Sequence, residues 1–112
     1  METIENRYKD RDYNITMRFP EFTCLCPMTS QPDFAEININ YVPDDKLVEL
    51  KSLKRYLNSF RNQGIFHEEV VNRIRDDFVA KVNPKKVEVI GNFNVRGGIY
   101  TTVKAFYPSP TL

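Results

Sequence analysis

The sequence predicts an α+β domain in which a four-stranded, mostly antiparallel sheet carries two helices on one face. Three observations predict it: apolar residues alternate in four segments, they recur at helical spacing in two others, and the order is strand, strand, helix, helix, strand, strand. Short connections between most segments favour neighbouring antiparallel strands. The 112 residues suffice for one domain, which we expect to span residues 1–112, with polar residues 1–10 and the tail 108–112 loosely ordered.

The four segments with alternating apolar residues are the expected strands. They are residues 11–19, 34–42, 87–93 and 99–107. Prolines interrupt the chain between the first two, so we expect a long loop over residues 20–33 that holds both cysteines. Because long loops in compact domains are more often functional than idle, this loop is the first place to look for chemistry.

Two segments place apolar side chains at helical spacing. The first covers residues 47–61, after a candidate N-cap at residues 44–45, and ends before Gly64. The second covers residues 70–82 and ends at Pro84. Two helices can cover one face of such a sheet but not its two edges. Because unpaired edge strands can pair with another chain, we expect an oligomer that assembles edge to edge.

Composition limits the possible functions. Sixteen Lys and Arg against fifteen Asp and Glu leave a net charge of +1, which argues against non-specific binding to nucleic acid. No apolar stretch is long enough to span a membrane, and the first residues do not resemble a secretory signal, so we expect a cytoplasmic protein. Two cysteines and one histidine are too few for a structural zinc site of the usual kind, and we expect no metal.

Cys26 and Asp33 are the strongest candidates for chemistry. A partly exposed thiolate near hydrogen-bond donors is a good nucleophile, and a carboxyl in a dry pocket can donate a proton at neutral pH. The loop between the first two strands is long enough to fold back and bring Asp33 beside the sulfur. The alternative is that Cys26 only packs and Asp33 only caps a turn. Cys24 is expected to pack in the interior or to be an incidental surface thiol.

Three charged groups outside that loop have both a functional and a structural interpretation. Lys51, Lys54 and Arg55 share a helical face that could hold phosphates, or they simply face solvent. Glu68, at the start of the second helix, could accept hydrogen bonds from a guanine-like ring, or it only complements the helix dipole. In the predicted turn, Arg96 before two glycines is a surface residue or an anion clamp.

Taken together, four blocks resemble the NADPH-dependent 7-cyano-7-deazaguanine reductases, the nitrile reductases of queuosine biosynthesis. The blocks are Phe22-Thr23 through Cys26-Pro27 with Thr29 and Gln31–Ala35, then Glu49–Tyr56, then Ser59–Asn62 with Phe66–Glu69, and finally Arg96–Gly98. The resemblance runs from about Glu21 to Tyr107. Arg55 departs from the pattern, where leucine is usual, and adds one cation beside two others.

The resemblance implies a tunnelling fold, a ββααββ unit that joins neighbours edge to edge into a ring or barrel. It implies a homo-oligomer, a decamer of two stacked pentamers, with active sites between subunits. The expected small-molecule substrate is 7-cyano-7-deazaguanine and the expected cofactor is NADPH, with no direct contact to nucleic acid or membrane.

The resemblance also implies roles for individual residues. Cys26 is the expected nucleophile, which forms a thioimide with the nitrile, and Asp33 the expected general acid. The expected substrate-binding residues are Val48, Glu49, Leu50, His67 and Glu68. The expected contacts to the NADPH phosphates are Lys51, Lys54 and Arg96. Two NADPH are consumed as the nitrile becomes 7-aminomethyl-7-deazaguanine.

Two other functions stay open from the sequence. A related amidine-forming enzyme of the same fold would attack the nitrile in tRNA with Cys26 but transfer ammonia, and it would not need Lys51 and Lys54. A non-catalytic purine- or pterin-binding protein on this scaffold would need neither the thiol nor Asp33.

Overall fold

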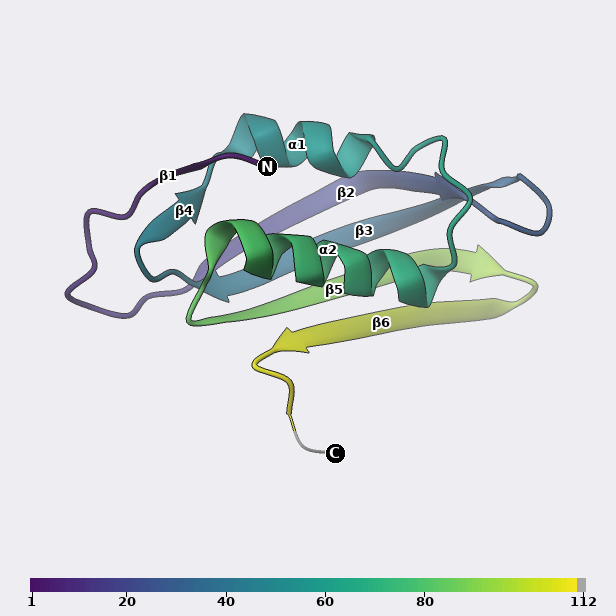
Figure 1. The fold of residues 1–112 in the computed structure, drawn as a ribbon. Coiled ribbons are helices and arrows are strands. Elements are labelled where there is room, and N and C mark those ends of the chain that lie inside the picture. Colours follow the sequence, from purple (N-terminus) through teal and green to yellow (C-terminus); the bar gives the residue numbers. More distant parts are fainter. Residues whose placement is uncertain (111–112) are drawn as a thin grey trace.

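The alternating segments form one antiparallel sheet with the strand order β2-β3-β5-β6. The strands are β2 (Ile15–Leu25), β3 (Pro32–Val42), β5 (Lys86–Arg96) and β6 (Ile99–Tyr107). The computed structural model describes residues 1–110, and Figure 1 shows both helices on the same side of this sheet. The predicted α+β class, with four antiparallel strands and two helices on one face, is confirmed.

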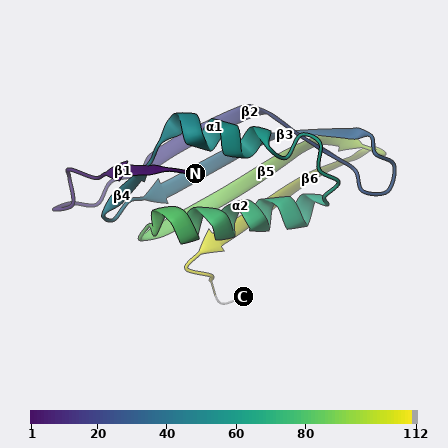
Figure 2. The same ribbon diagram turned by 45° about the horizontal axis from the view of Figure 1, so that its top comes forward.

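The two helices run across the sheet in opposite directions. They are α1 (Leu50–Asn58) and α2 (His67–Val82), and Figure 2 shows them apart from each other in front of the strands. Helix α1 begins later than predicted, because Glu49 and not residues 44–45 is its N-cap. Helix α2 ends at Asn83, whose left-handed conformation caps the helix just before Pro84.

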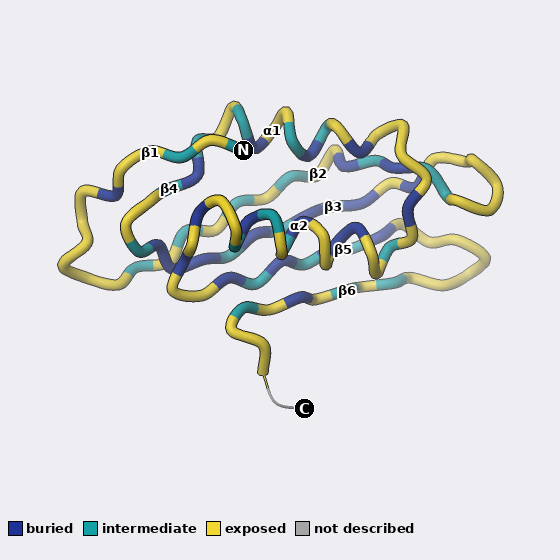
Figure 3. Tube along the Cα trace, in the orientation of Figure 1, coloured by how far each residue is buried: buried dark blue, intermediate teal, exposed yellow. Residues whose placement is uncertain are grey.

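The core lies between the inner face of the sheet and the two helices, with most of its helical residues on α2. Tyr41 of β3 packs edge-on against Phe78 of α2, with ring centroids 4.9 Å apart. Figure 3 shows the buried positions concentrated along β3, β5 and the inner side of α2. Gly91 permits this close packing, since a Cβ there would lie 2.6 Å from Val71 Cγ2.

The N-terminal segment is ordered where we expected it to be loose. Strand β1 (Thr3–Glu5) pairs antiparallel with β4 (Lys46–Val48) in a separate two-stranded sheet. Asn6 is fully buried and donates through Nδ2 to the carbonyl oxygen of Asp44. Backbone pairing depends little on side-chain polarity, which is why polar residues form a strand here. Residues 111–112 of the expected loose tail lie outside the described residues.

The loop between β2 and β3 is shorter than predicted. Strand β2 continues through Pro20 to Leu25, and the register with β3 shifts between Phe19 and Phe22. A proline is tolerated at a bulge in an edge strand, because its missing N–H removes no ladder hydrogen bond. The connecting loop is therefore residues 26–31, and Cys24 lies in a strand.

The face of the sheet away from the helices is polar. Arg18 pairs with Glu36, Asn40 donates to Glu88, and Thr102 donates to Asn92, all between neighbouring strands. Within the described part of the chain, no further strand pairs with the outer edge of β2 or β6, and only Leu25 at the end of β2 forms an isolated bridge, with Gly64. Among residues 1–110, no helix combines the length and the apolar character needed to cross a membrane.

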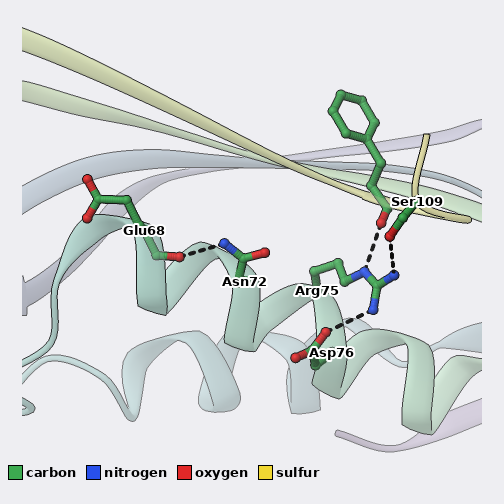
Figure 4. A network of polar contacts seen from close by, with 6 residues as sticks. Glu68, Asn72, Arg75, Asp76 and Ser109 are labelled. Carbon is green, nitrogen blue, oxygen red and sulfur yellow. Dashed lines mark hydrogen bonds and ion pairs between the residues drawn. The ribbon is translucent and has the colours of Figure 1, made fainter. Parts of the chain in front are cut away.

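Arg75 of α2 holds the end of β6 in place. Its Nε donates to the carbonyl oxygen of Phe106 at 2.8 Å, and its Nη2 donates to Ser109 Oγ at 3.2 Å (Figure 4). The guanidinium also lies 5.2 Å from the Tyr107 ring centroid. These contacts tie the last strand to the helix layer.

Candidate active site

Three connections meet at one end of the domain. The β2–β3 loop, the start of α2 and the β5–β6 turn all lie at the end away from β1 and β4 (Figure 1). The segment between α1 and α2 pairs with the end of β2, since Leu25 N donates to the Gln63 carbonyl oxygen and Ile65 N to the Leu25 carbonyl oxygen. That pairing fixes the position of Cys26, the next residue along the chain.

The loop that follows Cys26 closes on itself. Cys26 N donates to the carbonyl oxygen of Gln31, and Ser30 N donates to that of Cys26, both at 2.8 Å. Ser30 adopts a positive φ of 60°, the left-handed conformation that lets so short a loop turn back. The closure brings Cys26 alongside the start of β3, where Asp33 lies.

Cys26 lies among hydrogen-bond donors. The Thr29 hydroxyl, followed by the N–H groups of Met28 and Thr29, lowers the pKa of the Cys26 thiol from its ordinary value. Arg96 adds a smaller electrostatic contribution in the same direction. A lowered pKa increases the thiolate fraction at neutral pH, and the thiolate is the nucleophilic form. Cys24, by contrast, is fully buried, and burial raises its pKa to about 11.

We expect the substitution Thr29→Val to move the alkylation of Cys26 to higher pH. The hydroxyl stabilises the charged thiolate, so its removal raises the thiol pKa and lowers the reaction rate at neutral pH. The rate of iodoacetamide labelling, followed by mass spectrometry from pH 6 to pH 10, measures that pKa. Thr29→Ser should restore the profile, and Thr16→Val on the exposed side of β2 should leave it unchanged. An unshifted profile in Thr29→Val would exclude this role.

Asp33 is a buried carboxylate held between the side chains of His67 and Arg96. It is only 7% exposed and faces the helix layer at the second position of β3. His67 Nε2 lies 3.2 Å from Asp33 Oδ2, and Arg96 Nη2 lies 2.8 Å from Asp33 Oδ1. The structure thus brings together three predicted site residues that are far apart in the sequence.

His67 is positioned by stacking as well as by Asp33. Its ring lies on that of Phe93 in β5, with centroids 3.8 Å apart and planes 10° from parallel. The next residue, Glu68, is exposed, and its carboxylate points away from Asn72, which contacts only its main-chain oxygen (Figure 4). Among residues 1–110, Glu68 forms no ion pair, so its carboxylate is available to a ligand.

Arg96 ends β5 and begins the turn to β6. Gly97 and Gly98 follow with φ angles of 60° and 82°, which confirms the turn predicted from the two glycines. The arginine side chain runs back toward β3, where it also donates to the carbonyl oxygen of Pro32 at 3.2 Å. In this structure the partner of Arg96 is therefore the Asp33 carboxylate.

The start of α1 lies at the other end of the domain. Val48 is buried in β4, and its N–H donates to the Tyr41 hydroxyl. The Glu49 carboxylate caps α1 by accepting from the N–H groups of Lys51 and Ser52, which lowers its pKa. Leu50 is 65% exposed. Within one chain these residues are not brought together with Cys26.

Lys51 and Lys54 lie on the exposed side of α1. Among residues 1–110 neither lysine has an ion-pair partner, and Lys51 lines an open groove of about 530 Å³ together with Arg55 and Ser52. Lys54 lies instead beside a smaller hollow between α1 and β2. Unpaired cations at the rim of a groove, as Lys51 is, fit the phosphates of a nucleotide cofactor. Like the residues before them, they belong to the first part of α1, which begins at the end of the domain away from the β2–β3 loop (Figure 1).

Sequence reasoning missed two residues of this site. Thr29 was noted only as part of a family block, although a hydroxyl three residues after a cysteine in a short loop can donate to the sulfur. Phe93 was noted only as part of the predicted strand 87–93, and nothing in the local sequence indicates that it stacks on His67.

Comparisons with known proteins place the chain in a family. The model of a family described as QueF-like protein matches residues 32–111. A protein of Syntrophus aciditrophicus named NADPH-dependent 7-cyano-7-deazaguanine reductase is 56% identical over 110 residues, covering 98% of this chain and 79% of that protein. The chain belongs to this reductase family. A protein of the same name from Anaeromyxobacter sp. (strain K) is 58% identical over 105 residues, covering 94% of this chain and 86% of the relative.

A solved structure has the same fold as this reductase-family chain. The apo archaeosine synthase QueF-Like superposes with a TM-score of 0.77 at 23% identity, covering 89% of this chain and 96% of that one. At that identity the likeness supports the fold alone. It confirms the tunnelling-fold prediction, whereas the distinction from an amidine-forming enzyme rests on the reductase-family membership.

Proposed function

We propose that this chain reduces the nitrile of 7-cyano-7-deazaguanine to an aminomethyl group with two NADPH, in the biosynthesis of queuosine. The observation that carries the proposal is a thiol of lowered pKa in the closed loop that leads to a buried Asp33–His67 pair, in a chain 56% identical to a protein named for that reaction. NADPH, when bound, supplies a hydride to each of two carbon–nitrogen multiple bonds.

The thiol makes a difficult reduction easier. A nitrile carbon is a poor hydride acceptor, but the Cys26 thiolate can add its electron pair to that carbon. A carbon–sulfur bond forms, one carbon–nitrogen π bond breaks, and the nitrogen takes a proton from Asp33. The resulting thioimide is a better acceptor. After the first reduction and protonation of the nitrogen, the carbon–sulfur bond breaks, the thiolate leaves and an imine remains for the second reduction.

The side chains around Cys26 have separate tasks in this proposal. Asp33 donates the proton to the substrate nitrogen. His67 orients Asp33 through the contact between His67 Nε2 and Asp33 Oδ2. The unpaired Glu68 carboxylate accepts from the donor edge of the deazaguanine ring. Water must be excluded, because it would hydrolyse the imine to an aldehyde.

A second copy of the chain completes each site in this proposal. Val48, Glu49 and Leu50 lie away from Cys26 in one chain, so they line the same pocket only when another subunit supplies them. Two features support such an assembly. The sheet edge is open along β6 and along β2 up to the bridge at Leu25. Several apolar side chains are also exposed near the Cys26 end: Met28, Phe34, Phe66, Ile99 and Tyr100. We propose a decamer of two pentamers, located in the cytoplasm.

Thiol labelling with and without substrate tests the function. A catalytic Cys26 should react selectively with iodoacetamide and be protected by 7-cyano-7-deazaguanine, whereas the buried Cys24 should stay unlabelled in both cases. Guanine, which has no nitrile, is the matched control ligand and should leave no covalent adduct. Equal labelling with and without the nitrile would count against the proposal.

The lysines of α1 supply a test of the cofactor site. We expect Lys51→Met to raise KM for NADPH by about ten- to a hundredfold, because a charge-assisted hydrogen bond to phosphate is lost, while kcat changes less. Lys54→Met should act in the same direction. Lys81→Met, at an exposed position near the end of α2, is the control and should leave KM unchanged. An unaltered KM for NADPH in both α1 variants would show that the cofactor phosphates do not bind at this helix.

A further inference from the structure

We propose that the Arg96–Asp33 ion pair is a reversible restraint on the catalytic carboxyl, released when an anionic phosphate of the bound cofactor draws Arg96 away. This inference rests on the proposed function and deepens it, because it concerns the same site. It gives Arg96 two successive partners, whereas the sequence assigned it to the NADPH phosphates alone. The restraint would couple cofactor binding to the first covalent step.

The two oxygens of Asp33 face different side chains. His67 Nε2 lies 3.2 Å from Oδ2, and Arg96 Nη2 lies 2.8 Å from Oδ1. General acid catalysis needs a carboxyl oxygen that carries a proton and faces the reacting atom. In this structure Oδ1 faces the guanidinium instead, so one of the two partners has to move before Asp33 can protonate the substrate nitrogen.

His67 is the partner that is held more firmly. Its side chain is 19% exposed, it lies in the first turn of α2, and its ring stacks on buried Phe93. Moving the imidazole would break the stacking as well as the contact with Asp33. We therefore expect His67 to stay in place during the reaction.

Arg96 is the partner that can leave. Its side chain is 38% exposed and stands at the end of β5, after a register shift between Phe93 and Arg96. Gly97 and Gly98 follow with positive φ angles and have open space around them, since a Cβ at either would meet no atom within 4 Å. The only other polar partner of Arg96 among residues 1–110 is the Pro32 carbonyl oxygen, at 3.2 Å.

A phosphate is the chemical group suited to take Arg96 from Asp33. The planar guanidinium binds phosphate oxygens through two parallel hydrogen bonds, so it exchanges one charge-assisted contact for two. A cofactor phosphate would thus release Oδ1 while leaving Arg96 paired. A neutral substrate offers no such exchange, which is why we assign the release to the cofactor.

The test is the rate at which Cys26 adds to the nitrile, measured by intact-protein mass spectrometry. NADP⁺ is the probe, because it carries the phosphates of the cofactor but no hydride, and so the adduct is not reduced. In the native protein, saturating NADP⁺ should accelerate adduct formation about tenfold, the effect of one charge-assisted hydrogen bond. In Arg96→Ala, the adduct should form at the faster rate without NADP⁺ and respond to it no further.

Two controls separate this effect from others. Arg18→Ala removes the same charge from an exposed pair with Glu36 on the other face of the sheet, and it should respond to NADP⁺ as the native protein does. Arg96 also contributes to the lowered pKa of Cys26. Adduct rates are therefore divided by the iodoacetamide labelling rate of each variant, which corrects for the thiolate fraction.

Three results would overturn the inference. The first is a native rate that NADP⁺ does not change, and the second is an Arg96→Ala variant that NADP⁺ still accelerates. The third is an Arg96→Ala variant that, after correction for thiolate, adds more slowly than the native protein without NADP⁺. A native protein that forms no adduct under any condition would instead overturn the proposed function itself, and this inference with it.

Discussion

Cys26→Ala is expected to abolish both the reduction of 7-cyano-7-deazaguanine and the covalent adduct. Without the thiolate the nitrile stays a poor hydride acceptor, so turnover should fall by about 10⁴-fold or more, as for other covalent nucleophiles. The measurement pairs NADPH oxidation, followed by absorbance, with intact-protein mass spectrometry after incubation with the nitrile.

The control for this experiment is the same change at the other cysteine. Cys24→Ala removes a buried sulfur that faces the core, and it should lower stability modestly while leaving the adduct intact. Thermal unfolding of both variants separates loss of the fold from loss of the nucleophile. Normal turnover in a folded Cys26→Ala protein would show that the reaction does not pass through a thioimide.

Asp33→Asn should impair the chemical step far more than substrate binding. The amide keeps the shape of the side chain and can still contact His67 and Arg96, but it has no proton to give to the nitrile nitrogen. We expect kcat to fall by about 10²- to 10⁴-fold, the range of general acid catalysis. The dissociation constant of the substrate, measured by calorimetry with Cys26→Ala as background, should change much less.

Asp76→Asn makes the same chemical change at an exposed carboxylate of α2 that pairs with Arg75. Its kcat should match that of the native protein. If Asp33→Asn weakened substrate binding and left kcat unchanged, Asp33 would be a binding group and the proton would have to come from elsewhere. His67 would then be the next side chain to substitute.

The fold was predictable from the sequence where side-chain periodicity is strong. Both main helices and the central strands β3 and β5 follow from apolar spacing, because tertiary packing buries the faces that the spacing defines. The small β1–β4 sheet was not predicted, since its strands are short and largely polar. Pro20 was read as the start of a loop, whereas at a bulge in an edge strand it interrupts nothing.

The site was predictable in its residues but not in its contacts. Cys26 and Asp33 were identified from a short segment, and the loop closure explains why they lie at the same end. The Arg96–Asp33 pair joins residues that are far apart in sequence. It depends on the length of the β5–β6 hairpin and on the register shift before Arg96, and the periodicity of apolar residues specifies neither. The distance between Cys26 and the start of α1 likewise depends on the direction in which α1 crosses the sheet (Figure 1).

The most direct test of the central claim is the stoichiometry of the complete reaction. The protein is mixed with 7-cyano-7-deazaguanine and NADPH, loss of reduced nicotinamide is followed by absorbance, and the product is identified by mass spectrometry. The proposed function predicts two NADPH consumed for each 7-aminomethyl-7-deazaguanine formed. A covalent adduct at Cys26 without any loss of NADPH would contradict it and favour an amidine-forming enzyme, and neither adduct nor NADPH loss would leave only a binding role.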